Sequence, residues 1–125
     1  MYEEQKIMTK RALIVEDDMI LAMINQKYLE RIGCAVLRSV SNGLDAITAV
    51  KELNPDFVLM DIRLDGEMDG IEAMGYIREF SNVRVIYVSG NSESEIKQRA
   101  EKTNMYAFLI KPLDFGELKK LIDKL

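Results

Sequence analysis

Short apolar runs alternate along the chain with segments in which apolar residues recur every three or four positions. The runs have the length of β-strands and hold few polar residues, which predicts strands buried on both faces. The intervening segments predict amphipathic helices. The strands are expected at 12–15, 35–40, 57–60, 83–88 and 107–110. Because a helix follows every strand, the pattern predicts an α/β fold: a doubly wound parallel sheet with right-handed crossovers and helices on both faces.

The borders of the predicted elements carry signals of their own. A helix over 19–32 is predicted from four apolar residues at helical spacing: Ile20, Met23, Ile24 and Leu29. Asp18 is placed to cap its start and Gly33 to end it. The second strand contains Arg38 and Ser39, so an edge position is expected for it. The fourth helix, near 94–103, has a narrow apolar stripe and should be the least firmly docked helix.

Composition narrows the classes of function. The chain of 125 residues is long enough for one domain. It contains no histidine, which excludes His triads, His metal ligands and His general bases. The single Cys34 excludes a disulfide framework and a Cys-rich zinc site, and its free thiol suits a cytoplasmic location. The net charge of −4 argues against a nucleic-acid surface. No apolar run approaches the roughly 20 residues that a membrane helix needs.

Reactive side chains gather at the carboxyl ends of the predicted strands. They are Glu16 and Asp17 after the first strand, Asp61 after the third, Ser89 after the fourth and Lys111 after the fifth. In a parallel sheet these ends share one rim, so the side chains should converge. Three carboxylates at one place stay ionised together only if a cation compensates them. Because all-oxygen ligands suit Mg²⁺, the pattern predicts a magnesium site.

A metal ion, a carboxylate, a hydroxyl and a lysine together suit phosphoryl transfer. Asp61 is the natural nucleophile, since a carboxylate can attack phosphorus and form an acyl phosphate. This reaction depends on positioning and charge neutralisation more than on acid–base chemistry, so the absence of histidine is no obstacle. Mg²⁺, Lys111 and the Ser89 hydroxyl would neutralise or hydrogen-bond the phosphoryl oxygens.

These motifs, in this order and at this spacing, resemble the receiver domains of two-component response regulators. The matching segments are LIVEDD at 13–18, NGLDA at 42–46, DFVLMD at 56–61, MDG at 68–70, VSG at 88–90 and KP at 111–112. The resemblance covers about residues 11–125 and leaves 1–10 as an N-terminal extension. It implies a flavodoxin-like sheet with strand order 2-1-3-4-5.

The resemblance also implies roles for particular residues. Asp61 would accept a phosphoryl group from a histidine kinase or a histidine phosphotransfer protein. Mg²⁺ would be held by Glu16, Asp17, Asp61 and the backbone carbonyl of Arg63. On this basis the chain is expected to be a phosphoacceptor switch that modifies and demodifies itself, rather than a turnover enzyme.

The expected output follows from the same resemblance. Ser89 corresponds to the switch hydroxyl, Phe108 to the switch aromatic and Lys111 to the invariant lysine, whose bond to Pro112 is expected to be cis. Phosphorylation is expected to change the face formed by the fourth helix, the fifth strand and the last helix, which an unidentified downstream protein or output domain would read. The loop that follows Asp61 is one position longer than is usual in the family.

Two alternatives come from other classes of function. The first is a Mg²⁺-dependent phosphohydrolase with Asp61 as nucleophile; such enzymes commonly have a second aspartate two positions further on, where this chain has Arg63. The second is a receiver-like scaffold that is never phosphorylated. Retention of the whole set of rim residues argues against that scaffold.

Overall fold

A single parallel sheet forms the centre of the molecule. The computed structural model describes residues 9–125, so residues 1–8 of the predicted N-terminal extension lie outside the described part. The strands are β1 (Arg11–Val15), β2 (Ala35–Val40), β3 (Phe57–Asp61), β4 (Arg84–Ser89) and β5 (Ala107–Ile110). All neighbours pair in parallel, in the order β2-β1-β3-β4-β5. The predicted fold, the strand order and the edge position of β2 are therefore confirmed.

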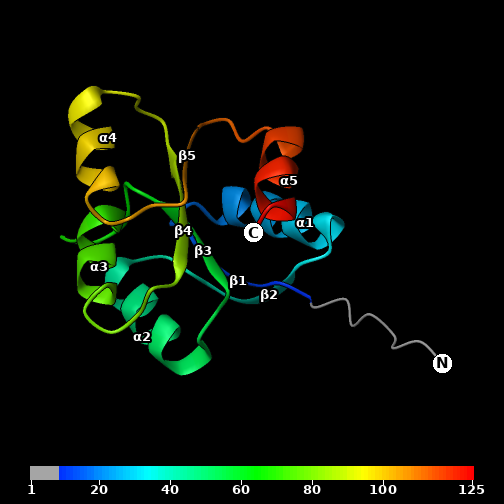
Figure 1. Ribbon diagram of the computed structural model, residues 1–125, viewed down its shortest axis with the longest axis horizontal. Helices are drawn as coiled ribbons and strands as arrows, with labels where there is room; N and C mark the ends of the chain where they lie inside the picture. Colours follow the sequence, from blue (N-terminus) through cyan, green and yellow to red (C-terminus); the bar gives the residue numbers. More distant parts are fainter. Residues whose placement is uncertain (1–8) are drawn as a thin grey trace.

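The helices cover the sheet in two layers. Figure 1 shows α1 (Met19–Ile32) and α5 (Phe115–Asp123) on one face, and α2 (Gly43–Leu53), α3 (Gly70–Ile77) and α4 (Ser94–Glu101) on the other. Successive residues of a strand point to opposite faces, so each strand contributes to two cores. In β1, Ala12 and Ile14 pack beneath α1 and α5, whereas Leu13 and Val15 pack on the opposite side. None of the helices in residues 9–125 is long and apolar enough to cross a membrane.

Two strands extend one residue further at their carboxyl ends than their apolar runs predict. Asp61 is the last residue of β3, where it pairs with Val88, and Ser89 is the last residue of β4, where it pairs with Ile110. Backbone pairing does not require an apolar side chain, so the ladder continues past the hydrophobic segment. This extension holds the backbones of both polar residues within the sheet.

The ends of α1 agree with the sequence, but most of its apolar stripe does not face the core. The Asp18 carboxylate accepts hydrogen bonds from the backbone N–H groups of Ile20 and Leu21, and Gly33 ends the helix with φ 106°. Within the stripe of apolar residues that predicts this helix, Leu29 alone is buried. The other side chain that α1 buries is polar, that of Asn25.

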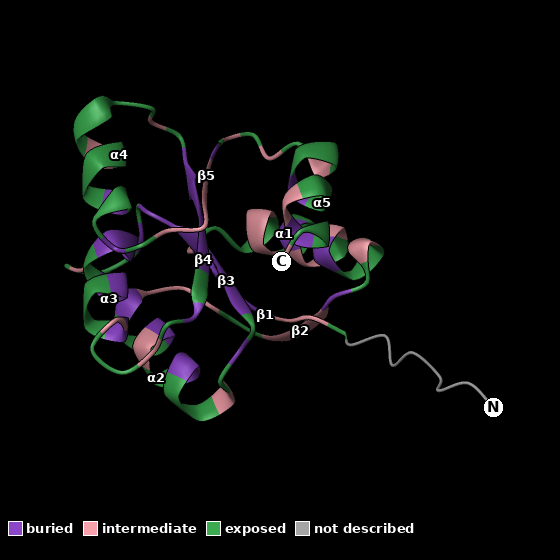
Figure 2. Cartoon of the chain, in the orientation of Figure 1, coloured by how far each residue is buried: buried purple, intermediate pink, exposed green. Residues whose placement is uncertain are grey.

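The predicted weak docking of α4 matches its burial pattern. Ala100 is the only buried residue of this helix, and no side chain caps its start. Figure 2 shows α4 largely exposed while the strands beside it are buried. Just after the C-terminal end of α4, the Thr103 hydroxyl donates a hydrogen bond to the carbonyl of Ala100. The same hydroxyl shares a 2.6 Å hydrogen bond with the phenol of Tyr87 in β4. The helix is therefore held mainly at its C-terminal end.

Candidate functional site

The ends of four strands bring the predicted side chains to one rim. Glu16 directly follows β1, Asp61 ends β3, Ser89 ends β4 and Lys111 directly follows β5. Burial differs among them: Glu16, Asp61 and Ser89 are each 5% exposed, whereas Lys111 is partly exposed. The polar ends of the strands therefore form a mostly buried cluster at the carboxyl edge of the sheet.

Three carboxylates in this cluster have the arrangement of a cation site. One oxygen from each of Glu16, Asp17 and Asp61 lies within 4.8 Å of the other two. Carboxylate oxygens are the ligands that Mg²⁺ prefers, and the site offers no nitrogen or sulfur ligand. The donor set therefore fits Mg²⁺. Arg63 lines the adjoining hollow, and the use of its carbonyl as a further ligand stays a prediction.

Lys111 supplies the positive charge that faces these acids. Its Nζ donates a hydrogen bond of 3.0 Å to Asp61 Oδ2 and lies 3.4 Å from Glu16 Oε1. Burial by itself lowers the pKa of Lys111, but the hydrogen bond with Asp61 and the charges of Asp61 and Glu16 raise it above its ordinary value. The ammonium group therefore stays charged beside the carboxylates.

One lysine does not balance the acids. Burial, together with a hydrogen bond shared with Asp61, raises the pKa of Glu16 to about 7. Proximity to Lys111 lowers the pKa but does not cancel this effect. Near neutral pH the cluster without a metal ion thus holds a proton on Glu16 for part of the time. A divalent cation would displace that proton, which is the behaviour of a metal site formed from acids.

A hollow beside Asp61 places the remaining predicted residues within reach of it. The hollow has a volume of about 420 Å³ and is lined by Asp61, Ile62, Arg63, Ser89, Gly90, Asn91, Ile96 and Lys111. The Ser89 hydroxyl donates to the carbonyl of Asn91 at 2.9 Å and accepts from its N–H at 3.0 Å. A group bound at Asp61 would compete with Asn91 for this hydroxyl. Ile96 brings the first turn of α4 to the same hollow.

Phe108 lies near the start of β5, away from the carboxyl end of the strand, and does not line this hollow. It is half-buried in the core that α2, α3 and α4 cover, with its ring centroid 6.5 Å from that of Tyr87. Its role as the switch aromatic stays a prediction. The Lys111–Pro112 peptide bond is cis, as the resemblance implies.

The loop between β3 and α3 is set by close packing at its end. The N–H of Gly70 donates to the carbonyl of Ile62 at 2.7 Å. A Cβ added at Gly70 would lie 2.2 Å from the backbone oxygen of Asp61, so no larger residue fits without a backbone shift. Asp69 caps α3 and forms an ion pair of 3.0 Å with Arg99 of α4. The loop therefore connects the Asp61 backbone with α4.

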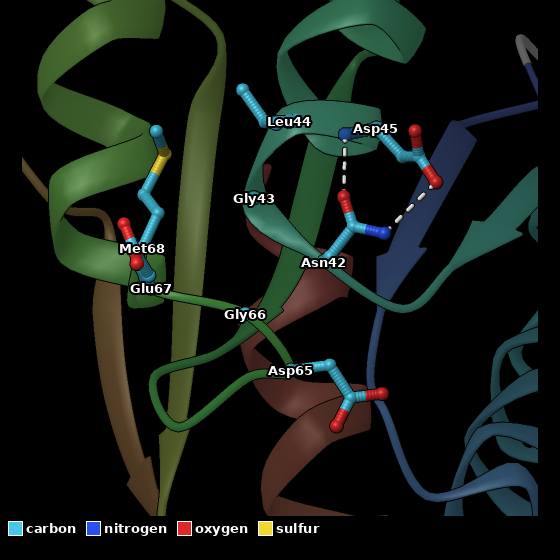
Figure 3. Close-up of a pocket in the computed structure, with 8 residues that line it drawn as sticks. All are labelled: Asn42, Gly43, Leu44, Asp45, Asp65, Gly66, Glu67 and Met68. Atoms are coloured by element: carbon cyan, nitrogen blue, oxygen red, sulfur yellow. Dashed lines mark hydrogen bonds between the residues drawn. The ribbon is translucent and has the colours of Figure 1, made fainter.

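The middle of this loop lies against the start of α2. Asp65 pairs with Asn42 in an isolated parallel bridge, and the two segments enclose a hollow of about 550 Å³ (Figure 3). The Asn42 side chain caps α2 through the N–H of Asp45 and also bonds its carboxylate, as the dashed lines in Figure 3 mark. None of the predicted site residues lines this hollow.

Comparison with known proteins identifies the family. The model of the response regulator receiver domain family matches residues 12–123, so the chain belongs to this family. It is 31% identical to the chemotaxis protein CheY of Thermotoga maritima, over 94% of this chain and 98% of that protein. It is 38% identical to the transcriptional regulatory protein ZraR of Klebsiella oxytoca, over 86% of this chain but 24% of that protein.

A solved structure adds a relative with ligands. A chain in the CheX–CheY–BeF₃–Mg²⁺ complex of Borrelia burgdorferi has a similar fold, with a TM-score of 0.85 and 25% sequence identity. The match covers 92% of this chain and 87% of that chain. Receiver domains are phosphoacceptor switches of two-component systems, and the chain is a member of that class of signalling domain. The family uses Mg²⁺ at an acidic pocket and interacts with histidine kinases and phosphotransfer proteins.

Sequence reasoning located the charged residues but missed two features of the site. The contact between the Ser89 hydroxyl and the backbone of Asn91 depends on how the chain turns after β4. The raised pKa of Glu16 depends on its burial beside Asp61. A pattern of residue types contains neither the local turn geometry nor the depth of burial.

Proposed function

We propose that Asp61 is the phosphoacceptor of this receiver domain and that Glu16, Asp17 and Asp61, with the carbonyl of Arg63, hold the Mg²⁺ required for the reaction. The observation that carries the proposal is the convergence of three carboxylates within 4.8 Å, with the ammonium of Lys111 3.0 Å from Asp61. The metal ion would supply positive charge next to the phosphoryl oxygens. Asp61 is the acid that also borders the 420 Å³ hollow, where a phosphoryl group has room.

The proposed transfer balances without any other co-reactant. An Asp61 carboxylate oxygen attacks the phosphorus of a phosphohistidine, a P–O bond forms, and the P–N bond breaks. The electron pair of the broken bond returns to the imidazole nitrogen of the donor. Lys111 releases its contact with Asp61 Oδ2 to meet the new phosphoryl oxygens. Water then attacks the phosphorus of the acyl phosphate, the bond to Asp61 breaks, and inorganic phosphate leaves with the carboxylate restored.

The switch is proposed to begin at Ser89. Its hydroxyl exchanges the carbonyl of Asn91 for a phosphoryl oxygen and draws the loop after β4 toward Asp61. Phe108 turns inward into the space that is released, and α4 reorients because few of its side chains are buried. Phosphorylation can shift this equilibrium only by the difference in its interaction with the two states.

The chain is proposed to act as a switch and not as a turnover enzyme. Within residues 9–125 no contact favours the phosphohydrolase alternative, since Arg63 occupies the position of the second aspartate that such an enzyme would use. The proposed phosphodonor is a histidine kinase or a histidine phosphotransfer protein. The reaction is proposed to take place in the cytoplasm, a reducing compartment that suits the free thiol of Cys34.

The central test is covalent labelling with a small phosphodonor. In acetyl phosphate and Mg²⁺, one phosphoryl group per chain should appear in the intact mass, and Asp61→Asn should abolish it. Asp65→Asn, which changes an exposed acid of the same loop, is the matched control and should be labelled like the unmodified protein. Equal labelling of the Asp61→Asn protein, or continuous release of phosphate without a labelled chain, would contradict the proposal.

A further inference from the structure

The fourth helix is docked by polar contacts more than by apolar ones. Ala100 is the only buried residue of α4, and Ile96 is partly buried against the core. Within residues 9–125, no side chain of 94–98 forms a hydrogen bond or an ion pair. The hydrogen bonds from side chains that hold the helix involve 99–104 instead. The position of α4 therefore depends on a few bonds near one end.

A buried tyrosine makes the first of these contacts. The side chain of Tyr87 in β4 is fully buried, and its hydroxyl oxygen lies 2.6 Å from that of Thr103. The single proton of the Thr103 hydroxyl goes to the carbonyl of Ala100, so the phenol is the donor to Thr103. Burial raises the pKa of the phenol to about 12, which keeps its proton in place. The centre of the sheet is thus bonded to the end of α4.

A guanidinium from α3 makes the second contact. Arg78 directly follows the last residue of α3, and its Nε donates to the carbonyl of Thr103 at 2.7 Å. Its Nη1 and Nη2 donate to the carbonyls of Ser81 and Asn104, at 3.2 and 3.3 Å. The planar fork of Arg78 therefore joins the end of α3 to the turn between α4 and β5.

The two ends of α4 meet opposing influences. The first turn reaches the hollow beside Asp61 through Ile96. The other end is bonded through Thr103 to Tyr87 and Arg78. Hydrogen bonds of 2.6–2.7 Å weaken steeply when their partners move apart or turn. A reorientation of the whole helix has to break or lengthen them.

We propose that Arg78 and Tyr87 are positioning residues that hold α4 in its resting orientation and so set how strongly the switch resists activation. The inference rests on the proposed function, in which α4 responds to a phosphoryl group on Asp61, and adds the restraint that opposes this response. The bonds to Thr103 are made in the resting orientation. Removal of one such bond raises the ratio of responding to resting orientations by about fivefold, the contribution of an ordinary hydrogen bond.

The restraint has a measurable consequence at Asp61. Binding and conformation are linked reciprocally, so a change that favours the responding orientation also tightens the binding of a phosphoryl mimic at Asp61, by up to the same factor. Loss of a bond that merely stabilises the fold has no such effect, because it favours neither orientation. Affinity for the mimic therefore separates a positioning role from a structural one.

The experiment compares the affinities of the unmodified chain and its variants for beryllofluoride, a stable mimic of a phosphoryl group, in saturating Mg²⁺. Tyr87→Phe removes the hydroxyl and keeps the ring. Arg78→Lys keeps the charge and loses the fork. Tyr106→Phe is the matched control, because the Tyr106 hydroxyl donates a 2.9 Å hydrogen bond to the carbonyl of Leu121 in α5 rather than to α4.

Tyr87→Phe and Arg78→Lys should bind beryllofluoride about threefold to tenfold more tightly than the unmodified chain, whereas Tyr106→Phe should bind it equally well. Before beryllofluoride is added, the amide resonances of 94–98 in both variants should lie between the free and bound positions of the unmodified chain. Unchanged or weaker affinity of Tyr87→Phe, or an equal gain in Tyr106→Phe, overturns the restraint.

Failure of the proposed function would look different. If the unmodified chain neither binds beryllofluoride in Mg²⁺ nor is labelled by acetyl phosphate, the role of Asp61 is wrong and the inference falls with it. If beryllofluoride binds but leaves the resonances of 94–98 in place, the proposed response of α4 is wrong and the restraint has nothing to oppose. If all four proteins bind beryllofluoride equally and α4 responds, the restraint alone is wrong.

Discussion

Glu16 shows how the environment of one residue sets the chemistry of the site. Its carboxyl group is buried within reach of Asp61 and Asp17, and Lys111 is the cation that contacts it. Burial penalises the charged form more than this single ion pair stabilises it, so its pKa rises to about 7. Repulsion among these carboxylates favours the binding of a divalent cation, which neutralises their charge.

The affinity for Mg²⁺ should therefore depend on pH in a defined direction. Below a pKa of about 7, binding must first remove a proton from Glu16, so affinity should increase by up to about tenfold per pH unit on approaching neutrality and level off above it. Isothermal titration of Mg²⁺ from pH 5.5 to about 8.5 measures this. Glu16→Gln should bind more weakly and lose most of the pH dependence. An equally steep profile in that variant would contradict the assignment.

Without a metal ion, the raised pKa of Glu16 should make the protein less stable as the pH rises. The native pKa of Glu16 is raised from 4.5 to about 7, so the native state binds the proton more tightly than the unfolded chain does. The contribution of Glu16 is thus fully present below about pH 4.5 and is lost as pH rises through about 7. In EDTA, Glu16→Gln should exceed the unmodified protein in unfolding free energy at pH 8 by on the order of 1–3 kcal/mol, and by less at pH 5. Urea denaturation at the two pH values decides this.

At the scale of elements, the start of α3 determines where Asp61 lies. Gly70 allows the helix to approach the backbone of β3, and its N–H holds the carbonyl of Ile62. Asp69 and Glu72 form a reciprocal capping box at the same end of the helix. The position of Asp61 is therefore fixed from both sides, by the β3–β4 ladder and by the first turn of α3.

Two glycines of the same helix should respond in opposite ways to alanine. Gly70→Ala forces a Cβ against the Asp61 carbonyl and should destabilise the protein by about 2–3 kcal/mol. Gly75→Ala meets nothing within 4 Å in the helix interior and should stabilise it by roughly 0.5–1 kcal/mol. Thermal or urea unfolding compares the two. Equal effects would mean that the close approach at Gly70 is relieved without cost.

At the scale of the whole molecule, the site at the rim connects to the least buried helix. Ile96 of α4 lines the hollow beside Asp61, and Arg99 forms an ion pair with Asp69 at the end of the β3–α3 loop. The other end of α4 is held through Thr103 and the buried phenol of Tyr87, whose pKa burial raises to about 12. Events at Asp61 can thus reach the first turn of α4 through Ile96, while Arg99 and Thr103 hold its C-terminal end.

Phosphorylation should therefore change the region from Ser94 to Lys111 more than α1 or α5. Amide chemical shifts recorded with Mg²⁺, before and after addition of acetyl phosphate, would test this. The largest changes should fall near Ser89, in the first turn of α4 and around Phe108. Ser89→Ala should still be labelled at Asp61 but should lose most of the shifts in α4. If 94–111 stays unchanged while Asp61 carries the phosphoryl group, the proposed output is wrong.

The sequence alone predicted the architecture because the relevant information is local. Apolar runs such as Phe57–Met60 set the strands, and the end signals at Asp18 and Gly33 set the first helix. The alternation of strands and helices then predicts a parallel sheet with right-handed crossovers, and the resemblance to receiver domains supplied its strand order. Because such a sheet aligns the carboxyl ends of its strands, the sequence also determined that Glu16, Asp61 and Lys111 would meet.

The tertiary structure decided which face of each element is buried and how deeply. Apolar spacing in α1 gives a helix but does not say that Asn25 turns inward and Met23 outward, because that depends on how the helix packs against β1, β2 and α5. The raised pKa of Glu16 and the contact of Ser89 with Asn91 arise in the same way, from desolvation and from a turn. Neighbouring residues encode periodicity, but burial and charge coupling exist only once distant segments are in contact.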